Sequence, residues 1–227
     1  ITMSEVRTPM MFRLGSRLSV FRKGQDEKQP TGIFENVVVR NVKAKASDSA
    51  QLKPPSGILI TGVPGHYISG LTLENIEIDL LGTGSLANSR QVVPEAIDQY
   101  PEVKTFGPVI PAYGIWARHV RGLKLKNVIF RISNNDLRPV LVCEDGKDIE
   151  ITGWTIPETS GAQSVIRLEN VEGAIISDNS VKGGAEAFVR IEGSESKGVR
   201  VIKNKASGIK KLIDLADGVA PATAVMK

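Results

Sequence analysis

Two short stretches of the sequence hold residues whose types could do chemistry. Arg118 and His119 are adjacent. A guanidinium can bind a carboxylate through two parallel hydrogen bonds, so Arg118 suits a sugar acid, and His119 could donate to a hydroxyl. A structural role, in which both residues hold a neighbouring loop, explains the pair equally well. Glu144 and Asp145 are the nearest approach to a carboxylate pair, but adjacent residues at a strand edge point apart, and a corner at Gly146 accounts for them.

Other candidates depend on stacking. His66 ends the segment VPGH at the corner that corresponds to His119 one unit earlier, and Arg138 precedes the next unit. If units stack about 4.8 Å apart, His66, Arg118 and Arg138 would form one substrate-binding cluster. Two histidines, one cysteine and no ligand-spacing motif argue against a metal site. We therefore predict no metal site and no cofactor within this sequence.

One structural unit repeats along the chain and would position these residues. In residues 114–127, GIWARHVRGLKLKN, a strand is followed by a tight corner, a second strand and an asparagine. The second strand begins again at Asn36, Gly70, Gly122, Asp148, Gly173 and Gly198. The last four of these starts are 26, 25 and 25 residues apart. Apolar residues alternate within each strand, and a period of two predicts one face turned inward and one outward.

The repeat also predicts columns of equivalent residues. On the outward side of the first strand we expect Leu59, Trp116, Val142, Arg167, Arg190 and Asp214, the last three as a ladder of charges. After the second strand, the corner is expected at Asn41, Asn75, Asn127, Gly153, Asn179 and Asn204. Asparagine and glycine tolerate the left-handed backbone of a sharp corner, and stacked asparagine amides can bond one another.

These regularities predict an all-β fold, a right-handed parallel β-helix with about 25 residues per coil. We expect one solenoid domain over residues 1–227, interrupted by an irregular insert at 83–112. A β-propeller would need about 40 residues per blade, and hairpin folds would need more Asn-Gly and Asp-Gly turns than the sequence has.

The insert at 83–112 is expected to pack as an ordered flap. Long loops within compact repeats are commonly functional. Tyr100, Glu102 and Tyr113 are assigned to the flap as candidate substrate contacts, since aromatic rings stack on sugar faces. The alternative is that the aromatic side chains pin the flap to the solenoid.

The first residues resemble the interior of a coil. Ile1, Met3 and Val6 match the inward positions of a later second strand, as if the chain entered the solenoid part-way. An open solenoid end exposes core and unpaired strand edges. We therefore expect further coils of the same protein before Ile1; a swapped or oligomeric cap is the alternative. Arg13 and Arg17 lie near this end, where they could line a groove or form a solvated surface.

The composition limits the classes of binding partner that we expect. The net charge of +4 permits an acidic polysaccharide ligand but is equally typical of proteins without one. Basic residues are spread along the chain, which argues against nucleic acid, and no apolar run is long enough to span a membrane. Cys143 falls on an inward position and is expected to be a buried, small hydrophobic residue.

Three segments carry a family resemblance. TGVPGHYISGLTLENI, YPEVKTFGPVIPAYGIWARHV and DLRPVLVCED resemble family 28 glycoside hydrolases, the polygalacturonase-like enzymes, and in particular their bacterial pectin-degrading branch. The resemblance runs from Ile1 to about Thr155 and is firmest at YPE…FG…PAYG…RHV. It implies hydrolysis of galacturonic acid or rhamnogalacturonan linkages with inversion, an acidic plant polysaccharide substrate, and an extracellular or periplasmic location.

The catalytic motifs of that family are absent from this sequence. Asn-Thr-Asp, Asp-Asp, Gly-His-Gly and Arg-Ile-Lys in a strand-edge setting do not occur. The resemblance therefore implies a C-terminal portion that forms one wall of the groove and is inactive alone. Two alternatives stay open. One is a polysaccharide lyase with Arg118 or Arg138 as base; the other is a non-catalytic carbohydrate-binding or structural solenoid.

Overall fold

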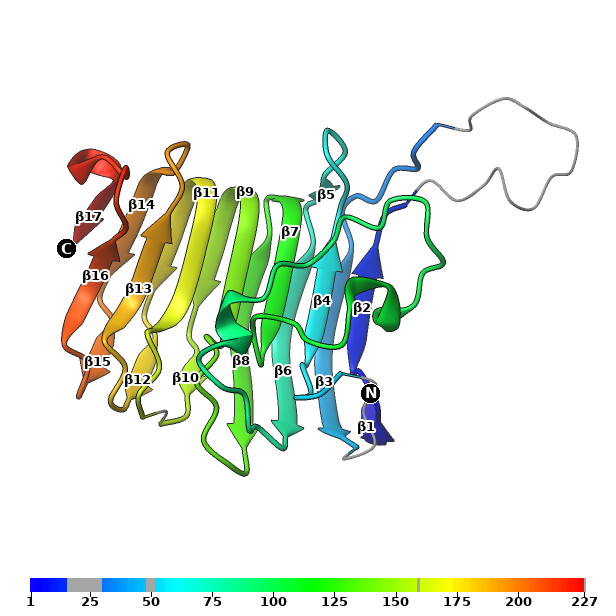
Figure 1. Ribbon diagram of the computed structural model, residues 1–227, viewed down its shortest axis with the longest axis horizontal. Coiled ribbons are helices and arrows are strands. Elements are labelled where there is room, and N and C mark those ends of the chain that lie inside the picture. The colour runs from blue at the N-terminus through cyan, green and yellow to red at the C-terminus, as the bar shows by residue number, and fades with distance from the viewer. Residues whose placement is uncertain (16–29, 48–51, 159, 227) are drawn as a thin grey trace, which may run out of the picture.

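The computed structural model describes residues 1–15, 30–47, 52–158 and 160–226, and their regular structure is almost entirely β-strand (Figure 1). Strands stack side by side along one axis, with the N-terminus and the C-terminus at opposite ends of the stack. Every pairing between named strands in the described residues is parallel. The predicted all-β, parallel solenoid arrangement is therefore confirmed.

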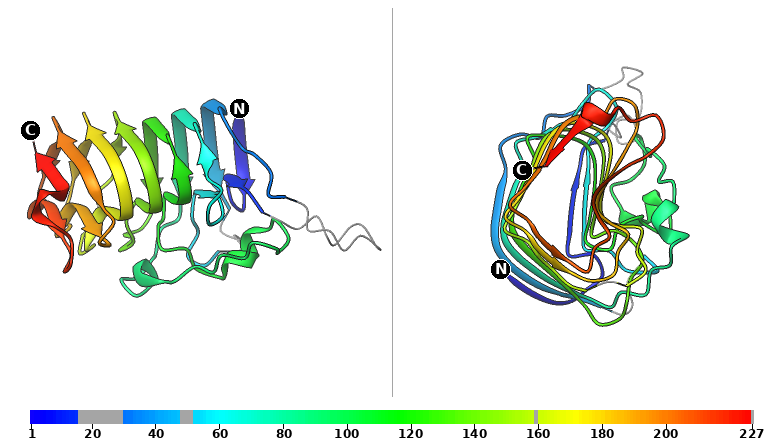
Figure 2. Two further views of the ribbon diagram at one scale, coloured as in Figure 1. Left: turned by 90° about the horizontal axis from the view of Figure 1, so that it is seen from above. Right: turned by 90° about the vertical axis from the view of Figure 1, so that its left-hand side faces the viewer.

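Seen along the axis, the stacked strands enclose a common interior and lie on three sides of it (Figure 2). The first side, here called face one, consists of β2 (Met10–Arg13), β4 (Ile58–Thr61), β7 (Ile115–Arg121), the first half of β9 (Leu141–Thr152), the first half of β11 (Ser164–Ser177), β13 (Ala187–Glu192) and β16 (Lys211–Leu215).

Face two follows after a corner. It consists of β1 (Thr2–Val6), β3 (Val38–Ala46), β6 (Thr72–Leu80), β8 (Lys124–Ile132), the second halves of β9 and β11, β14 (Lys197–Ile202) and β17 (Ala224–Met226). The third side is formed by the ends of β3, β6 and β8, then by β10 (Thr155–Ile156), β12 (Ser180–Lys182) and β15 (Lys205–Ser207). The two-residue strand β5 (Ile68–Ser69) pairs with the end of β7.

Alternation within the strands separates a buried core from an outer surface. Inward residues such as Ile60, Leu73 and Ile166 form one continuous apolar cluster, and Cys143 is buried in it as predicted. The expected outward column is also confirmed, because the register aligns Leu59, Trp116, Val142, Arg167, Arg190 and Asp214 across face one.

The corner after face two matches the prediction in four coils and departs from it in two. Asn41, Asn75, Asn127 and Gly153 have positive φ, and the three asparagines bond in series at 3.1 Å through their amides. In the last two coils Asp178 and Lys203 occupy the corner instead. The prediction for Asn179 and Asn204 was therefore wrong by one residue. Both lie one residue after the corner, where the Nδ2 of Asn179 donates to the Oδ1 of Asn204 at 2.9 Å.

The insert at 83–112 lies across the outside of face one (Figures 1 and 2). It contains two short 3₁₀ turns, η2 (Asn88–Arg90) and η3 (Val103–Phe106), while η4 (Pro221–Thr223) precedes β17. A second apolar cluster joins it to the solenoid: Leu59, Trp116 and Val142 pack with Leu52, which precedes β4, and with the insert residues Val93, Val103, Phe106, Ile110 and Ala112. Three outward residues are thus buried beneath the insert. No helix in the described part is long and apolar enough to cross a membrane.

Candidate functional site

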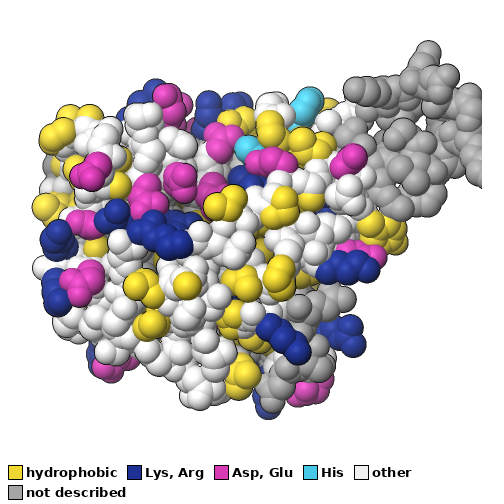
Figure 3. Space-filling model, viewed as in Figure 1, with side chains coloured by type: hydrophobic (Ala, Val, Ile, Leu, Met, Phe, Trp, Pro, Cys, Tyr) yellow, Lys and Arg dark blue, Asp and Glu magenta, His cyan; other side chains and the backbone are white. Residues whose placement is uncertain are grey.

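A second outward column on face one brings three glutamates together. Glu144, Glu169 and Glu192 occupy matching positions on β9, β11 and β13, and Arg118 on β7 precedes them in the same column. Beside the column is a cavity of about 300 Å³, here called the arginine–glutamate pocket. Its lining consists of Arg90, Gln91, Val92, Val93, Arg118, Glu144, Arg167, Glu169 and Glu192. Basic and acidic side chains gather on this part of face one, next to the insert (Figure 3).

Arg118 connects the pocket to the insert. Its guanidinium donates to the carbonyl oxygens of Val93 and Pro94, both at 2.8 Å, and lies 4.8 Å from the centre of the Trp116 ring. Glu144 lies 3.9 Å away across the pocket. The side chain is only 8% exposed, yet its buried Nε has no hydrogen-bond partner in the described residues. Arg118 thus lines the pocket with a guanidinium in which one buried N–H has no hydrogen-bond partner in the described residues.

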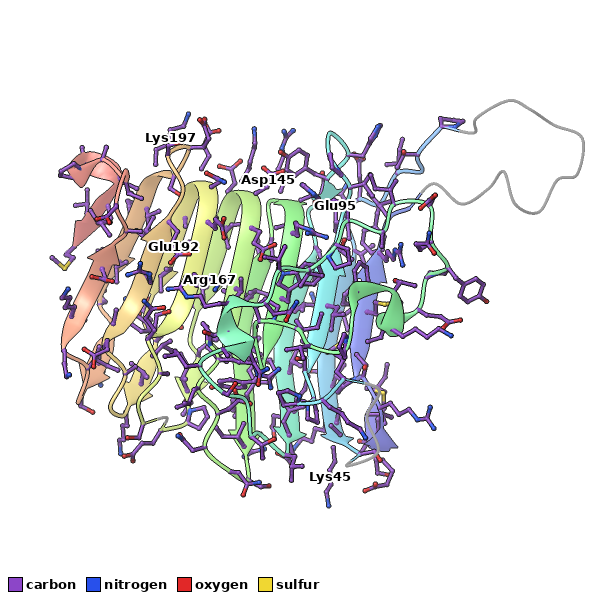
Figure 4. All side chains as sticks on the ribbon, in the orientation of Figure 1. Lys45, Glu95, Asp145, Arg167, Glu192 and Lys197 are labelled. Atoms are coloured by element: carbon purple, nitrogen blue, oxygen red, sulfur yellow. The ribbon has the colours of Figure 1, made fainter. Side chains whose placement is uncertain are left out.

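Arg167 sits between two of the glutamates. It donates to the carbonyl oxygen of Ser89 at 2.5 Å and lies 3.8 Å from Glu144 and 3.9 Å from Glu192. Figure 4 shows Arg167 and Glu192 side by side on neighbouring strands. Its side chain is 7% exposed, and its Nε also lacks a hydrogen-bond partner among the described residues. The pocket therefore has two buried guanidiniums with spare donor capacity next to carboxylate acceptors.

The outer glutamates of the column have pKa values shifted in opposite directions. Burial raises the pKa of Glu144, because the neighbouring Arg118 and Arg167 offset the loss of solvation only in part. Burial acts on Glu192 in the same direction, but hydrogen bonds from Arg190 at 2.6 Å and Arg90 at 2.9 Å outweigh it and lower the pKa. Such divergence is typical of sites where carboxyl groups differ in role, and also of structural ion-pair networks.

The lowered pKa of Glu192 gives a prediction for stability. A carboxyl whose pKa is lower in the folded state stabilises the fold above its ordinary value of 4.5, and this contribution is lost as the pH falls through the folded-state value. We expect Glu192→Gln to be less stable than the unmodified protein at neutral pH, with the difference shrinking as the pH drops below 4.5. Urea unfolding at a series of pH values measures it. Glu186→Gln, an exposed pair with Lys210, is the control and should show little change at any pH. A constant Glu192→Gln difference down to acid pH would contradict the assignment.

His119 links the solenoid to the insert and is not part of an open site. Its Nδ1 lies 2.6 Å from Asp145 and its Nε2 lies 3.1 Å from Glu95 of the insert. Tyr67 donates its hydroxyl to Asp145 at 2.8 Å, and burial together with this carboxylate raises the pKa of Tyr67 to about 12. Glu95 and Asp145 lie toward the same end of face one in Figure 4. The structural role considered for His119 is therefore the one that its contacts support.

The predicted cluster of His66, Arg118 and Arg138 is not formed. His66 is exposed at a tight turn, where its backbone pairs with Val63. Arg138 is fully buried before β9, near the start of the face-one strands, whereas Arg118 is the middle residue of β7. The guanidinium of Arg138 binds Asp136 at 2.7 Å and backbone carbonyls around it. The assignment of Arg138 to substrate binding was wrong because its side chain points into the protein.

The remaining candidates are divided between the insert and the core. Arg13 donates to the carbonyl oxygens of Tyr100, at 2.9 Å, and Ala96, so it fastens the insert. Tyr100 is half exposed, and Glu102 pairs with Lys104 at 2.6 Å on the surface. Tyr113 is buried in the solenoid core against Phe130, so its placement on the flap surface was wrong. Arg17 lies outside the described residues.

Sequence reasoning missed the pocket itself. Glu169, Glu192 and Arg90 were not singled out, and Glu95 and Tyr67 were not connected to His119. The signal for the glutamates was present, because Glu144 and Glu169 stand at the same position of successive units. The charge ladder on the first column is partial: Arg190 pairs with Asp214, whereas Arg167 turns to the glutamates.

Comparisons of the chain with protein-family models, curated proteins and solved structures find no match. Within the described residues, no group of three or more His, Cys, Asp or Glu side chains could hold a metal ion. The pocket combines planar cationic donors with carboxylate acceptors, and this set can bind a carboxylate and vicinal hydroxyls at the same time.

Proposed function

We propose that this chain is the C-terminal part of a pectin-active glycoside hydrolase resembling family 28, and that the arginine–glutamate pocket binds its acidic polysaccharide substrate. The proposal includes a right-handed β-helix of about 25 residues per coil. It also includes inverting hydrolysis with the catalytic carboxylates outside this chain, and an extracellular or periplasmic location, where plant polysaccharide is met.

One observation carries the proposal: Arg118 and Arg167 line the same cavity, and each has a buried Nε without a hydrogen-bond partner in the described residues. Buried polar groups are nearly always hydrogen-bonded, and the exceptions call for a ligand, a water or a catalytic reason. A uronate carboxylate would satisfy guanidinium donors, and Glu144 and Glu169 could accept from sugar hydroxyls. The net charge of the protein is mild, and the pocket lining balances three arginines with three glutamates, so the proposal rests on hydrogen-bonding groups and not on net charge.

Further coils of the same protein before Ile1 remain part of the proposal. The inward residues of the first coil, Met3, Val6, Met10 and Phe12, are only partly buried, whereas Ile60, Leu73 and Ile76 further along the stack are fully buried. An additional coil would cover them and pair with the edges of β1 and β2.

Binding to galacturonate oligomers tests the proposal. We expect Arg167→Ala to weaken binding tenfold to about a hundredfold, since hydrogen bonds to charged groups contribute about 1.5–3 kcal/mol. Arg167→Lys keeps the charge but loses the planar fork, and should also weaken binding. Arg200→Ala removes an exposed arginine from face two and is the matched control. Isothermal titration calorimetry gives the affinities.

Three outcomes separate the alternatives. Unchanged binding in both Arg167 variants would contradict the role of the pocket. Release of an unsaturated product by a longer form of the protein would favour the lyase. Binding without turnover by that longer form would favour a non-catalytic solenoid.

A further inference from the structure

The insert covers only part of face one along the solenoid axis. Toward the N-terminal end, the first outward column consists of Met11, Leu59, Trp116 and Val142, and these side chains pack under the insert. Toward the C-terminal end the same column continues as Arg167, Arg190 and Asp214, beyond the apolar cluster. The arginine–glutamate pocket lies at the boundary between the two parts.

Two anchors hold the insert at this boundary. Arg118 binds the carbonyl oxygens of Val93 and Pro94, and Arg167 binds that of Ser89. Arg90 also reaches back to Glu192 at 2.9 Å. Residues 89–94 therefore form a strap along the pocket, whose middle residues Gln91 and Val92 line it.

On the N-terminal side of Arg118, the insert covers the second outward column as well. Glu95 lies over Arg118 and His119, with contacts of 3.3 Å and 3.1 Å. Ala96 follows and accepts a hydrogen bond from Arg13 two strands further on, and the ring of Phe106 lies 4.8 Å from the Arg13 guanidinium. A sugar chain that followed the axis past Arg118 would have to displace this packed layer.

We infer that the pocket takes the end of an acidic sugar chain, and that the rest of the chain leaves over β13 and β16. The inference rests on the proposed function and adds its mode: recognition of a chain terminus instead of a chain interior. Glu192 of the second column lines the pocket, and Arg190 and Asp214 of the first column continue the surface beyond it. These residues offer further donors and acceptors to the second and third sugar of the chain.

The stoichiometry of binding distinguishes the two modes. The protein is titrated with galacturonate trimer, hexamer and polygalacturonate of defined length, and complexes are measured by calorimetry and analytical ultracentrifugation. Recognition of a chain end predicts one protein molecule per sugar chain at every length. It also predicts that covalent blocking of one of the two chain ends weakens binding at least tenfold.

Two other results would contradict the inference. A number of bound proteins that rises with chain length, together with indifference to blocked ends, would overturn the inference while leaving the proposed function in place. Absence of binding to every oligomer would instead overturn the proposed function, and the inference with it.

A variant of the insert that changes no pocket-lining residue gives a second test. Phe106→Ala removes the ring that packs on Trp116, at 5.5 Å between centroids, and is expected to loosen the insert over β4 and β7. Binding should then become possible along the chain interior, so that several proteins bind each polygalacturonate molecule. Leu86→Ala, an exposed residue of the same insert, is the matched control and should keep one protein per chain. Interior binding by the control as well would contradict the blocking role of the insert.

Discussion

Replacing Arg138 by alanine is expected to lower the free energy of unfolding by about 3–5 kcal/mol, because the change leaves a buried carboxylate without its partner. Arg138 and Asp136 are both fully buried, and the guanidinium contacts Asp136 at 2.7 Å and 3.0 Å. It also donates to the carbonyl oxygen of Pro55 at 2.7 Å and that of Ile110 at 3.1 Å. Through these hydrogen bonds, Arg138 links the segment before β4 to the end of the insert.

The matched control is Arg131→Ala. Arg131 pairs with Glu77 and Asp79 at 3.2 Å and 3.3 Å, but its side chain is 56% exposed. Exposed ion pairs contribute about 0–1 kcal/mol, so this variant should unfold almost as the unmodified protein does. Chemical denaturation monitored by circular dichroism measures both. A similar small effect in the two variants would show that the buried pair is not a stabilising element.

Removing both charged partners tests the mechanism of this loss. The double variant Asp136→Ala, Arg138→Ala has no orphan carboxylate, so it should be more stable than Arg138→Ala alone. We expect recovery to be incomplete, since the carbonyls of Pro55 and Ile110 still lose their donor. A strictly additive double variant would contradict coupling within the pair.

Trp116→Ala is expected to cost about 3–5 kcal/mol and to detach the insert from face one. The indole is fully buried although it points outward from β7. It packs edge-on against Phe106 at 5.5 Å and under the Arg118 guanidinium at 4.8 Å. Removing it leaves a cavity in the apolar cluster between the insert and face one, so the insert should become the first part of the protein to open.

Limited proteolysis separates this opening from global unfolding. Cleavage within 83–112 should become faster in Trp116→Ala, while cleavage in the strands should rise much less. Val92→Ala is the control, because Val92 is 82% exposed in the same insert and its change should stay within about 0.5 kcal/mol. Equal protection of the insert in both variants would mean that Trp116 is not its anchor.

Part of the candidate site could be anticipated from sequence, and part could not. Arg118 and His119 were recognised, since both follow a repeat strand. Their partners were not, because Glu95 belongs to an irregular segment whose path obeys no period. Arg138 illustrates the opposite error: its sequence position resembles that of a corner residue, but Asp136 and backbone carbonyls draw the side chain inward.

The stack of parallel strands and its inward and outward columns follow from the sequence alone, because alternation and unit spacing are local properties that every coil repeats. The order Leu59, Trp116, Val142, Arg167 on face one could therefore be predicted from the sequence. The tertiary structure decided which part of that face is covered and which is open. That choice depends on how the 83–112 segment packs across several coils at once, through apolar contacts to Trp116 and the hydrogen bonds of Arg13, Arg118 and Arg167. No short-range pattern encodes such long-range contacts, so the pocket exists only in the folded protein.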